Sequence, residues 1–124
     1  MSFPIAIVIG GETIEAELNN SETALRIVDA LPLEALFSTW GDEIYFTIPV
    51  SAGLQDGKET VEAGDLGYWP PGDAFCIFYG PTPGSDGNEI QPASPVTIIG
   101  GVIGDPKRFK MLSARGGTVR VERV

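Results

Sequence analysis

The stretch that decides the fold runs from Gly64 to Pro83 and reads GDLGYWPPGDAFCIFYGPTP. Two apolar runs, 66–69 and 74–79, flank the turn Pro70–Asp73. Proline fixes φ and lacks a backbone donor, so the two prolines fit poorly within a central strand. The pattern therefore predicts two strands joined by a rigid turn that could form the wall of a pocket. One alternating set of side chains in 74–79 must fill the interior, and the sequence leaves open which set.

Further strands are predicted on both sides of this stretch. Apolar runs and period-two alternation around Gly10-Gly11 and Gly116-Gly117 indicate two hairpins, the first with a turn that needs positive φ. The expected strands outside 64–83 are Phe3–Ile9, Thr13–Leu18, Glu43–Val50, a short one at Thr60–Glu62, Val96–Ile103 with a bulge at Gly100-Gly101, Phe109–Leu112 and Thr118–Val124.

Helical spacing occurs near the N-terminal third of the chain. Ala24, Leu25, Val28 and Leu31 recur at helical intervals behind a possible N-cap at Asn19–Ser21. Pro32 ends this helix, and residues 33–37 predict a further short helical turn. The whole span 21–37 is expected to form an amphipathic cover.

The element count predicts a single, mainly β domain over residues 1–124. About eight short strands with one or two helices favour a closed barrel or a sandwich, with the amphipathic helix plugging one open end of a barrel. Residues 81–95 form a proline-rich loop. A loop of about 15 residues within a compact domain is usually functional or mobile.

Composition narrows the partners that we expect. The net charge is −9, and residues 1–106 alone carry 16 acidic and 2 basic side chains, a net of −14. This balance argues against nucleic acid as a partner, since phosphate binding needs clustered Lys and Arg. The basic residues of 107–124 are expected beside the acidic body as exposed strand charges. No apolar run suits a membrane helix and no signal peptide is recognised, so we expect a cytoplasmic protein without a membrane partner.

Several chemistries are disfavoured by what the chain lacks. It contains no histidine, which excludes His-based zinc sites, Ser-His-Asp triads and Cys-His dyads within one chain. Cys76 is the single cysteine, so no internal disulfide can form, and its apolar surroundings predict a small buried hydrophobe. Gly100–Asp105 lacks the dinucleotide-binding spacing. We therefore expect neither a metal nor a cofactor.

Three segments carry a resemblance to a known family. They are STWGDEIYF at 38–46, GDLGYWPPG at 64–72 and IQPASPV at 90–96, in this order. With them the chain resembles the small bacterial and archaeal cyclophilin-like proteins, a family of unknown function, and the resemblance runs nearly end to end. It implies a closed, eight-stranded, cyclophilin-like β-barrel capped by helices.

The resemblance also raises the question of prolyl isomerase activity. True cyclophilins use an arginine on the strand after the first helix, which would correspond here to Glu43–Val50. This strand has no arginine, and no basic residue occurs between Arg26 and Lys58. The departure counts against isomerase activity, because that arginine is thought to stabilise the twisted amide electrostatically.

The candidate site is a groove where the outward face of 43–47 meets the aromatic turn and the long loop. Its expected residues are Trp40, Glu43, Tyr45, Tyr68, Trp69, Phe78 and Gln91. Trp69 could alternatively pack only on the prolines beside it. Asp42 and Glu43 make a poor catalytic pair, because neighbours in a strand point to opposite faces. Phe46 is assigned to the core.

Three functions remain open at this stage. The first is binding of a small molecule or short peptide in an aromatic and proline-walled groove, with Glu43 or Gln91 fixing a polar end. The second is enzymatic, either a weak prolyl isomerase or an unknown activity using Glu43 and Tyr45. The third is a structural role in which edge strands pair in a homo-oligomer.

Overall fold

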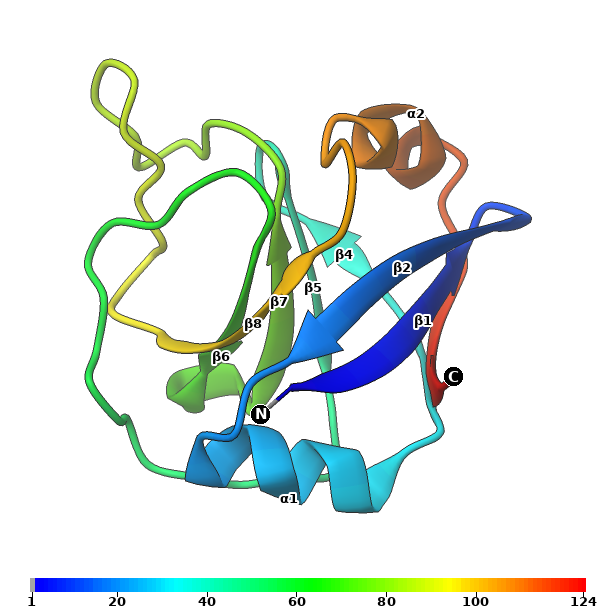
Figure 1. The fold of residues 1–124 in the computed structure, drawn as a ribbon. Helices are drawn as coiled ribbons and strands as arrows, with labels where there is room; N and C mark the ends of the chain where they lie inside the picture. The colour runs from blue at the N-terminus through cyan, green and yellow to red at the C-terminus, as the bar shows by residue number, and fades with distance from the viewer. Residues whose placement is uncertain (1) are drawn as a thin grey trace.

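The structure is a computed structural model that describes residues 2–124, and its strands form one antiparallel sheet (Figure 1). The strand order is β3-β9-β1-β2-β8-β6-β7-β5-β4. The strands are β1 (Phe3–Ile9), β2 (Glu12–Leu18), β3 (Leu33–Leu36), β4 (Ser38–Thr39), β5 (Glu43–Thr47), β6 (Asp65–Trp69), β7 (Ala74–Phe78), β8 (Thr97–Val102) and β9 (Thr118–Arg123).

The sheet curls into a nearly closed barrel because its two edge strands are consecutive in the chain. Only Phe37 separates β3 from β4, and its N–H donates to the Gly117 carbonyl at 3.3 Å. The predicted mainly β barrel is therefore confirmed, with nine strands where eight were expected. The 33–39 segment adds two unexpected strands, which are the two sheet edges, whereas the expected strand at Thr60–Glu62 forms only an isolated bridge between Val61 and Ile90.

Two helices lie at opposite ends of the barrel (Figure 1). The predicted helix α1 (Glu22–Ala30) begins after Ser21, whose Oγ accepts from the Ala24 N–H at 3.2 Å. Its apolar face, with Ile27 and Val28, joins the barrel interior. The second helix, α2 (Arg108–Ala114), contributes Phe109 and Leu112 to the same interior.

Two predicted elements change type. Residues 33–36 form a strand, not a helical turn, because pairing with β9 places Leu33 opposite Val121 and overrides the helical propensity of Leu, Glu and Ala. Residues 108–114 form a helix, not a strand. The i, i+3 spacing of Phe109 and Leu112 buries both on one helical face, which the period-two interpretation overlooked.

The predicted turn and bulge are largely confirmed. Gly10 and Gly11 have φ of 58° and 81°, as a two-residue hairpin with positive φ requires. The register between β6 and β8 shifts between Leu66 and Gly67, which leaves Ile99 as the extra residue, one position before the predicted bulge. Gly100 also allows close strand approach, since a Cβ there would collide with the Glu17 carbonyl oxygen.

The structure decides which side chains of 74–79 fill the barrel. Phe75, Ile77 and Tyr79 belong to the interior cluster, where Phe46 stacks on Phe75 with ring centroids 5.1 Å apart. Cys76 and Phe78 face outward into a second cluster. We call these the inner cluster and the outer cluster. Phe46 is a core residue, as predicted.

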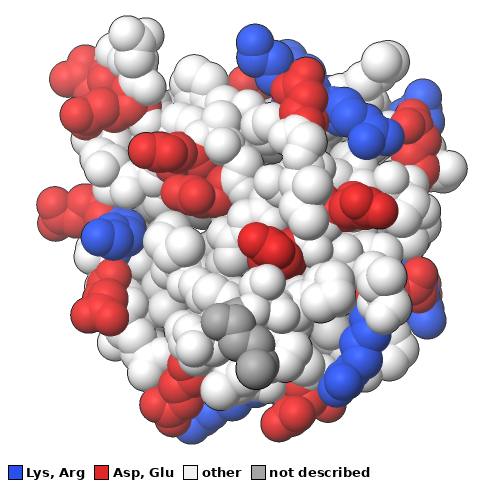
Figure 2. Space-filling model, viewed as in Figure 1, with Lys and Arg blue, Asp and Glu red and all other residues white. Residues whose placement is uncertain are grey.

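The basic C-terminal residues do lie beside acidic groups of the body. Lys110 pairs with Asp42 at 3.2 Å and Arg108 with Glu12 at 3.0 Å. Both cations come from α2, so the prediction of strand charges was wrong in that respect. Figure 2 shows Lys and Arg side chains gathered around α2, while Asp and Glu spread over much of the same face. None of the helices within 2–124 is long and apolar enough to cross a membrane.

Candidate functional site

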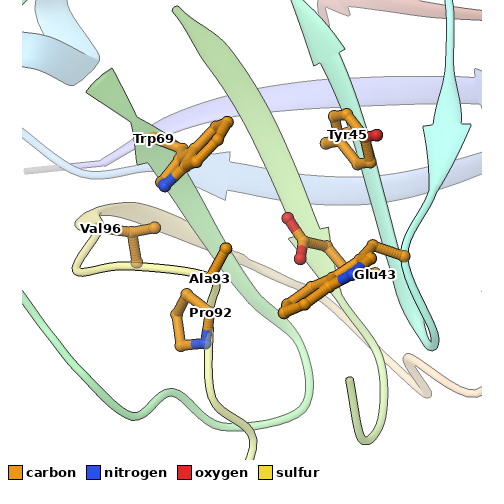
Figure 3. Close-up of a pocket in the computed structure, with 7 residues that line it drawn as sticks. Glu43, Tyr45, Trp69, Pro92, Ala93 and Val96 are labelled. Carbon is orange, nitrogen blue, oxygen red and sulfur yellow. The ribbon is translucent and has the colours of Figure 1, made fainter. Parts of the chain in front are cut away.

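A pocket of about 190 Å³ lies on the outside of the barrel wall formed by β5, β6 and β7 (Figure 3). Apolar and aromatic side chains surround a single carboxyl group in it. The lining residues are Trp40, Glu43, Tyr45, Trp69, Pro92, Ala93 and Val96. The structure thus brings four of the predicted groove residues together around one hollow.

The period of β5 positions the carboxyl and the phenol. Glu43 and Tyr45 are two residues apart and share the outward face of the strand, as predicted. Trp40 reaches the same hollow through the short turn between β4 and β5, where its N–H donates to the Glu43 carbonyl at 2.9 Å. The hydrogen-bonded β4–β5 turn therefore supports one side of the pocket.

The rigid turn after β6 supports the other side. Pro70–Gly72 forms a 3-10 helix that begins directly after Trp69. A Cβ at Gly72 would lie only 2.9 Å from Trp69 Cζ3, so the indole packs over this glycine. The opposite edge of the ring points to the long loop, where Trp69 Nε1 donates to Ser94 Oγ at 2.7 Å. Trp69 therefore connects the turn to the loop as well as lining the pocket.

The long loop is held in place by its own hydrogen bonds. Ser85 Oγ accepts from the Thr82 N–H at 2.9 Å and from the Gln91 N–H at 3.2 Å. The Thr82 hydroxyl donates to the Gln91 carbonyl. Pro92 and Ala93 follow this closed loop directly and form the wall opposite β5. These side-chain bonds add to the backbone bonds that anchor the segment, from the Asp42 N–H to the Pro81 carbonyl and from the Val61 N–H to the Ile90 carbonyl, each at 2.9 Å.

Three predicted site residues lie outside the pocket lining, and each has a physical reason. Tyr68 has no exposed surface and points into the inner cluster, with its hydroxyl donating to the Val50 carbonyl at 2.7 Å. Phe78 also has no exposed surface, since it packs in the outer cluster against Val96. Gln91 uses its backbone N–H and carbonyl to close the loop. Tyr68, Phe78 and Gln91 therefore do not belong to the lining of this pocket.

Sequence reasoning missed Pro92, Ala93 and Val96. All three belong to the 90–96 motif, in which Gln91 was chosen for its polar side chain. The lining of an apolar pocket is built more readily from the proline and aliphatic side chains that follow Gln91 in this motif. Val96 also packs over Gly67 of β6. A Cβ at Gly67 would lie 3.1 Å from Phe78 and 3.2 Å from Val96, so a glycine in the middle of this strand marks a close contact.

Glu43 has unusual electrostatics for a carboxyl group. Only 7 % of the residue is exposed, and burial raises its pKa from 4.5 to about 7, while hydrogen bonding to the Cys76 thiol lowers it in part. The same proximity acts on Cys76, whose pKa rises well above its usual value through burial and the charge of Glu43. Near neutral pH, Glu43 is therefore able to hold or release a proton inside the pocket.

The remaining side chains limit the chemistry. The pocket lining includes no Lys or Arg. Within residues 2–124, no three His, Cys, Asp or Glu side chains gather as metal ligands would. The arrangement offers aromatic faces, an apolar floor and one titratable carboxyl.

Comparisons with known proteins agree with this fold. The cyclophilin-like family model matches residues 3–122, so the chain belongs to the cyclophilin-like family. It is similar to a hypothetical protein of Archaeoglobus fulgidus known from a solution structure, with 38 % identity and a TM-score of 0.79 over 99 % of this chain and 95 % of the other. No functionally curated protein matches. The resemblance seen in the sequence is thereby confirmed.

Proposed function

We propose that this protein binds a small molecule or a short peptide in the pocket over β5–β7, without the catalysis of a prolyl isomerase. The observation that carries this proposal is the convergence of three separate segments on one hollow. The turn after β4, the outward face of β5 and the 92–96 loop all contribute lining residues, and Trp69 joins the loop to the barrel.

The composition of the lining supports binding. Ligand sites are mostly apolar and aromatic, with a few placed polar groups that fix orientation. Here Glu43 is the acidic group among two tryptophans, a tyrosine, a proline and two aliphatic residues. The volume of about 190 Å³ is below the roughly 300–1,000 Å³ of sites that enclose drug-sized ligands. The pocket therefore suits a compact ligand or one end of a peptide.

The proposal predicts that Trp69→Ala weakens ligand binding more than it weakens the fold. A fragment library screened by thermal shift and NMR supplies ligands of the wild type, and their dissociation constants are then compared with those of the variant. Leu36→Ala is the matched control, since Leu36 is 77 % exposed on β3, outside the pocket lining. If no fragment binds the wild type while the variant's unfolding midpoint collapses, Trp69 is a packing residue and the proposal fails.

A second measurement addresses catalysis. Exchange NMR on an Ala-Pro peptide should show peptide signals that shift or stay unchanged, with no faster cis/trans exchange, because the pocket lining carries no arginine. Accelerated exchange would instead establish an isomerase that works without that group. Tyr45 and Trp69 would then be the first residues to substitute.

A further inference from the structure

We propose that the pocket recognises a small organic cation, with an ammonium head group seated against the rings of Trp40, Tyr45 and Trp69 and the Glu43 carboxylate as its counter-ion. This inference rests on the proposed binding function and adds the chemical class of the ligand. It is carried by the combination of three aromatic side chains and one carboxyl in the same hollow.

The aromatic rings of the pocket supply one half of a cation site. The face of an aromatic ring carries partial negative charge and attracts a cation within about 6 Å of its centre, tryptophan most strongly. Both tryptophans of the chain and one of its three tyrosines line this pocket. Figure 3 shows the Glu43 carboxylate pointing into the space bordered by Trp69, Tyr45 and Ala93. A cation in that space would lie beside aromatic rings and the carboxylate together.

The charge of the pocket is not already neutralised by the protein. No Lys or Arg is among the lining residues, whereas the neighbouring Asp42 has its own partner in Lys110. The titratable groups that face Glu43 are the Cys76 thiol from β7 and Tyr45 from its own strand, neither of which is a cation at neutral pH. An ammonium group would thus supply the missing positive charge.

The volume of the pocket and the negative charge of the protein also favour a small cation as the ligand. A volume of about 190 Å³ accommodates a compact head group. The body of the protein is strongly acidic, with a net of −14 from 16 acidic and 2 basic side chains in residues 1–106. Such a field raises the local concentration of cations and disfavours anions.

Proton linkage follows from the state of Glu43. Burial raises its pKa to about 7, and a bound cation favours the ionised form. Cation binding below neutral pH must then displace a proton. Because about one tenth of Glu43 is ionised at pH 6 and about nine tenths at pH 8, the affinity should be roughly tenfold weaker at pH 6.

The test compares two probes of the same shape, choline and its uncharged carbon analogue 3,3-dimethyl-1-butanol. Each is titrated by NMR and by tryptophan fluorescence at pH 6 and pH 8. We expect choline to bind at least tenfold more tightly than the neutral probe at pH 8 and to lose about tenfold in affinity at pH 6. The neutral probe should show little change with pH.

Two variants that each remove one negative charge distinguish the effect of the pocket carboxylate from that of the protein's overall negative charge. Glu43→Gln should remove the pH dependence of choline binding and most of the preference for choline, with the remainder coming from the three rings. Glu15→Gln changes the net charge equally on the exposed face of β2, and it should leave both properties unchanged.

The outcomes distinguish this inference from the proposed function. Equal affinity for the two probes overturns cation recognition, yet the pocket still binds a ligand. Failure of both probes also overturns it, and the fragment screen then decides separately whether the pocket binds anything. An undiminished choline preference in Glu43→Gln would show that the carboxylate is not the counter-ion and would equally overturn the inference.

Discussion

The inner and outer clusters lie on opposite sides of the same two-stranded ribbon, β6–β7, and they are built differently. Phe75 and Ile77 point inward and are enclosed by strands and by both helices. Cys76 and Phe78 point outward, and their cover comes from the loop residues Ile90 and Val96. All four side chains are buried, so β7 is apolar on both faces.

The two clusters differ in what covers them, and only the outer cluster lies beside the pocket. Strands and both helices supply most of the inner cluster, and Ile48 and Val50 from the segment after β5 add to it. The cover of the outer cluster is held by two isolated backbone bridges, Val61 to Ile90 and Lys58 to Val96, and by side-chain hydrogen bonds of the loop. At its rim lies the pocket with the buried Glu43. Two clusters of similar burial are thus expected to respond differently to the same change.

Truncating one phenylalanine in each cluster tests this comparison and should give the largest effect. Phe75→Ala leaves a cavity among fixed elements and should lower the free energy of unfolding by about 4 kcal/mol. Phe78→Ala should cost about 3 kcal/mol, because the loop can settle into the vacated space. Urea unfolding of both variants and the wild type provides the measurement. An equal loss in the two variants, or a larger loss for Phe78→Ala, would contradict a more adaptable outer cover.

The second-largest effect concerns Glu43 at the rim of the outer cluster, which should make the free energy of unfolding depend on pH. Below pH 4.5, its usual pKa, the carboxyl is protonated in both states and burial costs nothing. As the pH rises through the window up to about 7, the unfolded chain releases the proton while the folded protein keeps it. Stability from this group therefore falls as pH rises, by about 2 kcal/mol between pH 5 and pH 8.

Glu43→Gln is neutral at every pH and isolates this contribution. The wild type should lose stability relative to Glu43→Gln by about 2 kcal/mol from pH 5 to pH 8, measured by urea unfolding at each pH. Because only the difference is taken, the other carboxyl groups cancel. Glu15→Gln, on an exposed face, should track the wild type within about 0.5 kcal/mol. A constant difference between wild type and Glu43→Gln would show that Glu43 is ionised in the folded protein throughout.

The sequence was sufficient for most of the barrel and failed where tertiary contacts override local pattern. Strand alternation and the Gly10-Gly11 turn were enough to place the first hairpin. Residues 33–36 have helical propensity, but pairing with β9 makes them a strand. Residues 108–114 were too short a segment for periodicity to separate one buried strand face from a helix that covers the end of the barrel.

The site was predictable where side-chain direction follows from the strand period. Glu43 and Tyr45 were placed on one outward face by that rule, and both line the pocket. Tyr68 and Phe78 were misplaced because both faces of β6 and β7 are buried, which removes the alternation that marks an outward side. The loop wall at Pro92 and Ala93 depends on hydrogen bonds across the loop, which no local pattern encodes.

The smallest expected effect concerns the bond that joins the loop to the barrel. Ser94→Ala removes the acceptor of Trp69 Nε1 and should weaken loop closure by about 1 kcal/mol with little change in global unfolding. Cys76 reports on this opening, because its thiol is buried in the outer cluster. Thiol labelling of the native protein should be slow in the wild type and about fivefold faster in Ser94→Ala. Ser38→Ala, an exposed change on β4, should leave the rate unchanged. Identical labelling rates in Ser94→Ala and the wild type would mean that Cys76 becomes accessible only when the whole barrel unfolds, and the two clusters would then form one cooperative unit.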